Sequence, residues 1–381
     1  MSCLSVTDKY VAVARGLQID LYDYAKHILI EVSSTAENDQ INGVVVSSDS
    51  KHLAVTTNVA KQLLLYDLPA SKNCKVFDLP RSSSKMRFTS DNSHVLLADK
   101  SGDVLSFDIN VEDEVNQPKG QKIFGHLSLI LDVLQSSNRK YVISSDRDEK
   151  IKVSCYPNTY EIQTYCLGHT EFVNHIEELP HDAKYLVSSS GDGTIKIWDY
   201  IEGKNCYTID TFSDVNDVKL RDSFKEKMDE EVPIKTLPII HLTVTKLNEN
   251  CSILVVSVHS YEMLLIYSLH SADGKLSHKL ETKLKIDKFP TGVQLHDSTL
   301  VVYNDVDYSI TFYSMLYLNG TISFDKSKVE NVFDALSESQ GNIHNHFETI
   351  KLLFKRKFDN VQEYQERKKL RLEKSAIKNA E

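Results

Sequence analysis

The sequence predicts an all-β fold: a seven-bladed β-propeller followed by a short helical extension at its C-terminal end. Three observations support this prediction. Residues 168–199 run from a Gly-His pair through an apolar strand and an Asp-containing turn to a Trp-Asp pair. Aromatic-Asp pairs, or degraded forms of them, recur along the chain, and an apolar run precedes each one. Because one four-stranded blade cannot bury both its faces, a clear blade requires several others.

The aromatic-Asp pairs mark the ends of seven third strands. They are Tyr22-Asp23, Tyr66-Asp67, Phe107-Asp108, Ser154-Cys155, Trp198-Asp199, Tyr267-Ser268 and Tyr313-Ser314. Their second members are separated by 44, 41, 47, 44, 69 and 46 residues. Five of these intervals fit one repeat period of about 40–45 residues, as in WD40 propellers. The long interval contains 219–238, a charged and Pro-containing segment, which indicates a surface loop insertion.

Seven apolar or β-branched runs each precede a polar turn and then a third strand. These runs are Val11–Ala14, Leu53–Thr56, Val95–Ala98, Tyr141–Ser144, Tyr185–Ser188, Leu254–Ser257 and Thr299–Tyr303. We therefore expect a seven-bladed WD40 propeller over residues 1–326 and a helical, basic extension over 327–381. Ring closure stays open: residues 3–7 could supply the first inner strand and Thr321–Phe324 the last outer one.

Composition favours a soluble protein of the nucleus or cytosol. The chain has 381 residues, 41% hydrophobic and 26% charged. Its apolar runs have the length of strands, so we expect no transmembrane helix and no membrane partner. The first residues lack the pattern of a secretory signal. Six scattered cysteines without metal-ligand spacing indicate reduced thiols and no metal site. Because no nucleotide-binding motif is present either, we expect no cofactor on this chain.

A possible catalytic triad in blade five is better explained as architecture. His169, Ser188 and Asp192, with Trp198, occupy the positions of a buried hydrogen-bond network in this repeat. A second copy occurs in blade four, where we expect His126 and Asp148 to pair and Ser154 replaces the tryptophan. No Gly-rich phosphate loop or nucleophile elbow is present in the sequence. The chain is therefore predicted not to be an enzyme.

The turn between the second and third strands of blade four is unusually charged. Blade five has Ser-Gly-Asp-Gly-Thr at this position, whereas blade four has consecutive charges. Such a turn is either simply solvated or holds ion pairs to a partner protein. Lys150 and Lys152 share one face of the strand, and Ile151 points into the blade packing. The candidate partner-binding residues are Arg147, Asp148, Glu149, Lys150, Lys152 and, on a second charged turn in blade three, Lys100.

Several strings in this region resemble one particular family. They are ADKSGDVLSFDI (98–109), GHLSLILDV (125–133), SSDRDEKIKVS (144–154), CLGHTEFV (166–173) and KFDNVQEYQERKKLRLEK (357–374). Together they resemble the WD-repeat, non-catalytic subunit of the eukaryotic tRNA (guanine-N7)-methyltransferase. The similarity is strong over residues 95–200 and looser elsewhere.

The resemblance implies a heterodimer with a catalytic methyltransferase subunit. That partner would carry S-adenosylmethionine, hold most of the tRNA and methylate a guanine of the variable loop, at position 46. In this family, the residues that match Glu149 and Lys152 pair with oppositely charged side chains of the catalytic subunit. We expect the complex in the nucleus, with the cytoplasm as a second location.

The C-terminal segment is basic although the chain as a whole carries a net charge of −10. Residues 351–381 contain ten Lys and Arg residues against five acidic ones. Mixed spacing near three and four predicts one or two amphipathic helices, the first of which is expected to dock on the propeller; the residues that carry this pattern are Phe347, Ile350, Leu353 and Phe354, then Val361, Tyr364, Lys368 and Leu372. The cluster Arg367, Lys368, Lys369 and Arg371 is either a solvated helix face, a nuclear-import signal or a contact to tRNA phosphates.

Two other functions compete with the methyltransferase subunit. A ubiquitin-ligase substrate receptor, or another WD-repeat scaffold, uses the same fold. Such receptors often carry Arg two positions after Trp-Asp, whereas Trp198-Asp199 is followed here by Tyr200-Ile201. An enzyme acting alone has no candidate site beyond the recurring structural networks.

Overall fold

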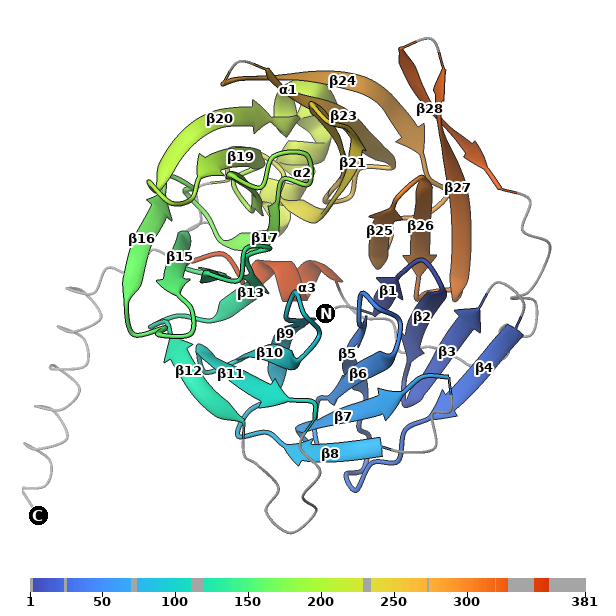
Figure 1. The fold of residues 1–381 in the computed structure, drawn as a ribbon. Coiled ribbons are helices and arrows are strands. Elements are labelled where there is room, and N and C mark those ends of the chain that lie inside the picture. The colour runs from blue at the N-terminus through green and yellow to red at the C-terminus, as the bar shows by residue number, and fades with distance from the viewer. Residues whose placement is uncertain are drawn as a thin grey trace, which may run out of the picture.

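The predicted seven-bladed propeller is confirmed. The computed structural model describes residues 3–23, 26–69, 74–110, 120–228, 234–272, 274–318, 320–327 and 346–355. Its strands form seven four-stranded sheets, each built from four consecutive antiparallel strands, and the sheets are arranged as a ring (Figure 1).

The blades follow chain order. Blade one consists of β1 (Leu4–Val6), β2 (Tyr10–Arg15), β3 (Gln18–Asp23) and β4 (Lys26–Glu31), and blade two of β5 (Ile41–Val46), β6 (His52–Thr57), β7 (Gln62–Asp67) and β8 (Cys74–Asp78). Blade three consists of β9 (Ser83–Phe88), β10 (His94–Asp99), β11 (Asp103–Asp108) and β12 (Gln121–Gly125), and blade four of β13 (Ile130–Gln135), β14 (Tyr141–Asp146), β15 (Lys150–Cys155) and β16 (Ile162–Leu167). Blade five consists of β17 (Val173–Glu178), β18 (Tyr185–Ser190), β19 (Thr194–Asp199) and β20 (Lys204–Asp210), and blade six of β21 (Ile239–Asn248), β22 (Cys251–Val258), β23 (Met263–Ala272) and β24 (Lys275–Lys285). Blade seven consists of β25 (Gly292–His296), β26 (Thr299–Asn304), β27 (Ser309–Leu318) and β28 (Thr321–Lys326).

The second and third strands form the core because neighbouring blades cover both of their faces. The seven apolar runs lie in the second strands, and the seven marker pairs lie in the third strands, as predicted. In blade four, Ile151 and Val153 pack against Val173 and Ile176 of blade five. Burial on both faces explains why these strands appear in the sequence as continuous apolar runs rather than alternating ones.

Short polar side chains shape the turns between first and second strands. The Ser47 hydroxyl donates to Asp49 (2.6 Å), Thr89 donates to Asp91 (2.8 Å), and Ser136 donates to Asn138 (2.7 Å). Ser, Thr, Asn and Asp favour such turns because their side chains bond to nearby groups of the same turn. The same local chemistry therefore recurs in blades two, three and four.

Ring closure needs no strand exchange between the two ends of the propeller. β1 pairs with β2 in blade one, and β28 completes blade seven, as the sequence suggested. The two blades meet through side chains: the Val6 N–H donates to Gln294 (2.9 Å), and His296 pairs with Asp8 (2.8 Å). A side chain on Gly292 would meet Leu4 at 3.0 Å, so the close approach of β1 and β25 requires a small residue there.

The segment 219–238 differs from the expected surface loop. It follows α1 (Thr211–Val215) and contains most of α2 (Val218–Lys227), which Asp217 caps by accepting from the Leu220 N–H (2.9 Å). Phe224 of α2 is buried in the core cluster that joins blades five and six. The charges around Phe224 concealed a helix that is anchored mainly by one aromatic side chain.

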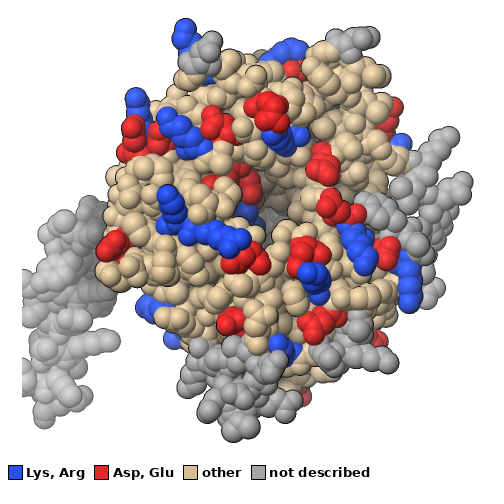
Figure 2. Space-filling model, in the orientation of Figure 1, with Lys and Arg blue, Asp and Glu red and all other residues tan. Residues whose placement is uncertain are grey.

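A charged network joins the innermost strands of blades three, four and five. Arg87 donates to Asp132 (2.8 Å) and to Glu177 (2.7 Å), and His175 lies 3.1 Å from Asp132. Burial alone would raise the pKa of Asp132, but the nearby cations hold it well below its usual range. These strands surround the central hollow, around which side chains of both signs are interspersed (Figure 2). The network therefore connects blade four to both its neighbours.

The described part of the extension contains α3 (His346–Lys351), which Figure 1 shows near the middle of the ring. The basic cluster at 367–371 lies outside the described residues. No helix in the described part of the chain is long and apolar enough to cross a membrane.

Candidate partner interface

In the charged turn of blade four, one residue adopts a left-handed backbone conformation for which blade five uses glycine. Glu149 has φ 71°, and Gly193, the equivalent residue of blade five, has φ 72°. This left-handed conformation costs a non-glycine residue about 1 kcal/mol or more. The turn geometry alone would favour glycine, so a role for the Glu149 side chain would explain its presence.

The buried histidine of blade four uses a different acid from the one expected. His126 lies 2.9 Å from the Asp146 carboxylate and 2.7 Å from the Ser144 hydroxyl. Asp148 does not take part, contrary to the prediction, because Asp146 enters the blade two positions earlier. Asp148 instead accepts from the Ser128 hydroxyl (2.9 Å) at the edge of the blade. This exchange leaves Asp148 beside Glu149, where both face the surface.

Blade five contains the complete network. His169 lies 2.9 Å from Asp192 and 2.8 Å from the Ser188 hydroxyl, which also accepts from the Trp198 indole N–H (2.8 Å). His169 is buried and Trp198 fully so. A hydroxyl that both an imidazole and an indole engage is committed to the blade, so this arrangement does not provide an accessible nucleophile.

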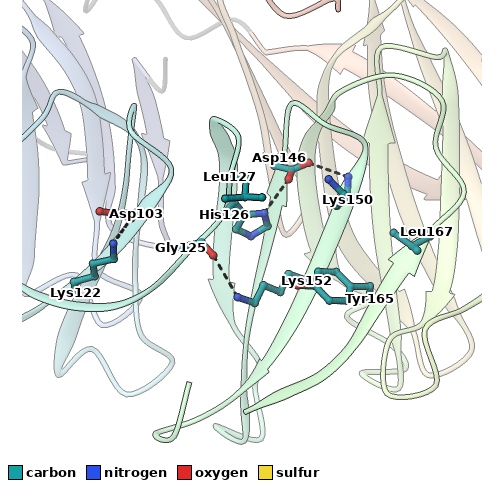
Figure 3. A pocket seen from close by; sticks show the side chains of 10 residues that line it. All are labelled: Asp103, Lys122, Gly125, His126, Leu127, Asp146, Lys150, Lys152, Tyr165 and Leu167. Atoms are coloured by element: carbon teal, nitrogen blue, oxygen red, sulfur yellow. Dashed lines mark hydrogen bonds and ion pairs between the residues drawn. The ribbon is translucent and has the colours of Figure 1, made fainter. Parts of the chain in front are cut away.

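Lys150 and Lys152 line a hollow of about 560 Å³ between blades three and four (Figure 3). They share one face of β15, where they pair with Leu167 and Tyr165 of β16. On the blade-three side, Lys122 pairs with Asp103 at 2.6 Å. The predicted alternation on β15 thus directs both lysines into a single recess.

Lys152 is the most buried cation of this recess, with 8% of the residue exposed. Its ammonium donates to the Gly125 carbonyl (3.3 Å) and lies 5.0 Å from the centre of the Phe124 ring. Burial lowers its pKa. Among the described residues, no carboxylate forms an ion pair with Lys152. A buried ammonium held only by a carbonyl and a ring would gain from an added anion.

Apolar side chains around the recess are exposed. Leu127 is fully exposed, Leu167 is 61% exposed and Tyr165 39%. All three line the hollow around the two lysines. Exposed apolar groups around a polar centre are typical of protein–protein contact sites.

Sequence reasoning missed these three residues. One signal was available, because Leu127 follows Gly-His where blade five has Thr170. The exposure of Tyr165 and Leu167 depends on how far blades three and four separate, which no local pattern reveals.

The remaining candidates lie elsewhere on this surface. Lys100 donates to Asn58 of blade two (3.4 Å) and does not line the hollow.

The Arg147 guanidinium lies 4.0 Å from Asp148 on the charged turn of blade four. Asp148 and Glu149 both face Lys355, which follows α3. The structure therefore brings together an acidic turn and, beside it, a cationic recess with an apolar rim.

Comparison with known proteins identifies the family. The WD40 domain family of the tRNA methyltransferase TRM82 matches residues 23–122 and 110–309. The chain belongs to this family.

Its relatives carry consistent names. The tRNA (guanine-N(7)-)-methyltransferase non-catalytic subunit wuho of Drosophila erecta is 30% identical over 344 residues, covering 89% of this chain and 78% of that protein. The non-catalytic subunit wdr4 of Xenopus laevis is 38% identical over 172 residues, covering 45% and 42%. These names support the prediction of a non-catalytic subunit that does not act as an enzyme itself.

Solved structures support the fold. A chain of the crystal structure of the mitotic checkpoint complex superposes with a TM-score of 0.65 at 13% identity, covering 82% of this chain and 86% of that chain. Similarity at this level of identity concerns the propeller architecture alone.

Proposed function

We propose that this non-catalytic subunit binds the catalytic tRNA N7-methyltransferase subunit as a heterodimer through blades three and four. The Lys152 ammonium is the observation that carries this proposal. It is nearly buried, the described residues that hold it are neutral, and its rim is apolar. A carboxylate of the partner would supply the missing counter-charge, and apolar partner side chains would cover Leu127 and Leu167.

Glu149 and Asp148 offer the opposite charge next to the recess. A partner that presents an acid to Lys152 and a base to the turn would be held in one orientation, because the reverse docking would place like charges together. The propeller would act as a rigid surface that stabilises the active conformation of the catalytic subunit by binding it preferentially. S-adenosylmethionine and most of the tRNA would then belong to the partner.

The variable-loop guanine is the proposed target, and the nucleus is the proposed main location of the complex. Both rest on membership of the family together with the basic tail, whose cluster at 367–371 fits a nuclear-import signal or a phosphate contact.

Reconstitution tests the proposal. The catalytic subunit, S-adenosylmethionine and tRNA are combined with and without this chain, and N7-methylguanosine is quantified by mass spectrometry. We expect a one-to-one complex and methylation that depends on this chain. A catalytic subunit that neither co-purifies with the chain nor responds to it would refute the proposal. Recovery of a ubiquitin-ligase adaptor instead would favour the alternative scaffold function.

A further inference from the structure

The C-terminal segment 346–355 is docked on the propeller near the proposed interface. Ile350 and Phe354 are buried in the core cluster of blades five and six. The Phe354 ring lies 5.1 Å from Phe172, which precedes β17, and 6.1 Å from Phe224 of α2. Phe347 lies 5.9 Å from Phe224. These aromatic contacts fix the segment in place.

The residue that follows this anchor occupies the acidic turn of blade four. The Lys355 ammonium lies 3.0 Å from the Glu149 carboxylate and 3.6 Å from the Asp148 carboxylate. Burial alone would lower the pKa of Lys355, but pairing with Glu149 and Asp148 raises it above its ordinary value. The two acids to which the partner is proposed to bind are thus already paired with a cation of the chain itself.

The contact is suited to exchange. The side chains of Lys355, Glu149 and Asp148 are 40%, 35% and 31% exposed, so water screens the pair and its loss costs little. The anchor at Phe354 is separate from the ion pair, so the Lys355 side chain can rotate away while the segment stays docked. A surface ion pair next to a buried anchor can therefore open without unfolding anything.

We propose that Lys355 is an intramolecular latch on the acidic turn, and that the catalytic subunit displaces it with a cationic side chain of its own. This inference rests on the proposed function. The latch keeps Glu149 and Asp148 paired while the subunit is free and disfavours partners that cannot replace the charge. Because Lys355 competes for the same carboxylates, removing its charge strengthens partner binding.

Binding measurements on the full chain test the latch. Lys355→Met keeps an unbranched side chain only one heavy atom shorter and removes its charge, whereas Lys355→Arg keeps the charge and serves as the matched control. We expect Lys355→Met to bind the catalytic subunit about two- to five-fold more tightly than the wild type, which is the effect of one exposed ion pair. Lys355→Arg should bind like the wild type.

A second readout follows the contact directly. A carbodiimide should link Lys355 to Glu149 or Asp148 in the free chain, and the yield of that link should fall in the complex. The latch would be overturned if Lys355→Met bound the catalytic subunit no more tightly than the wild type and the cross-link formed in equal yield in the complex and in the free chain. Glu149→Lys separates the two proposals, because the proposed interface predicts that this charge reversal abolishes binding of the catalytic subunit. If it does so although the latch is overturned, the proposed function stands without the latch. If Glu149→Lys and Lys152→Glu both bind normally, the proposed interface itself is wrong.

Discussion

Lys152 and Lys196 show how one position in the repeat can serve two purposes. Both occupy the middle of a third strand, 44 residues apart. Lys196 lies near Thr208 on its own blade (3.3 Å), whereas Lys152 lies beneath exposed apolar side chains against blade three. The alternation of side chains along the strand predicted the face on which Lys152 lies. Its burial was not predictable, because that depends on the packing of two blades.

Leu127 gives a prediction at the residue scale. It is fully exposed in the free subunit, so Leu127→Ala should leave thermal stability unchanged. If the partner covers it, the variant should bind the catalytic subunit about ten-fold more weakly, equivalent to about 1.4 kcal/mol of lost apolar burial. Calorimetric titration measures this. Leu318→Ala, at another exposed leucine in blade seven, is the control and should bind normally. Equal affinities for the two variants would place the interface elsewhere.

At the scale of elements, the repeat period identified the strands but not how they are joined. The marker pairs and apolar runs gave every second and third strand, because these strands are buried on both faces. The helix α2 was missed since a single phenylalanine in a charged segment produces little helical periodicity. The contact between Lys355 and Glu149 was missed because it joins residues 206 positions apart.

The Arg87–Asp132–Glu177 network gives a prediction at this scale. Asp132→Asn leaves Arg87 with a weaker partner and should lower the free energy of unfolding by about 2–3 kcal/mol. The network holds blade four between blades three and five. Denaturant titration at pH 7 measures the loss. Asp91→Asn, on an exposed turn of blade three, is a suitable control with a smaller expected effect.

The same network predicts the acid sensitivity of the fold. Burial opposes ionisation of Glu177, but Arg87 outweighs it and lowers the pKa of Glu177 to about 2; the pKa of Asp132 is also lowered. Carboxylates whose pKa falls on folding stabilise the native state above their unfolded pKa, about 4. This contribution is lost as pH falls from about 4 towards 2. The difference between wild type and Asp132→Asn should therefore shrink over that range; a constant difference would contradict this assignment.

At the scale of the whole molecule, charge is divided between a propeller and a basic tail. The tail follows the docked segment 346–355, so it starts close to the acidic turn of blade four. The sequence predicted this asymmetry from composition alone. The place on the propeller at which the described part of the extension ends became apparent only from the docking of Phe354.

Removal of residues 365–381 tests the role of the tail. If Arg367, Lys368, Lys369 and Arg371 contact phosphates, the truncated heterodimer should bind tRNA more weakly and with a smaller salt dependence. The two subunits should still co-purify, since the truncation spares blades three and four. Filter binding at several salt concentrations provides the measurement. If the salt dependence of tRNA binding does not change, the basic cluster does not contact tRNA and is either a solvated helix face or a nuclear-import signal.

The recess around Lys152 is the proposed docking site of the catalytic subunit. The most direct test compares Lys152→Glu with Lys196→Glu, the same reversal at the equivalent position of the neighbouring blade, and measures tRNA N7-methylguanosine formed by each with the catalytic subunit. We expect both chains to remain folded by thermal melting, Lys152→Glu to lose methylation, and Lys196→Glu to retain it. Equal methylation by the two folded variants would show that the catalytic subunit does not dock in this recess.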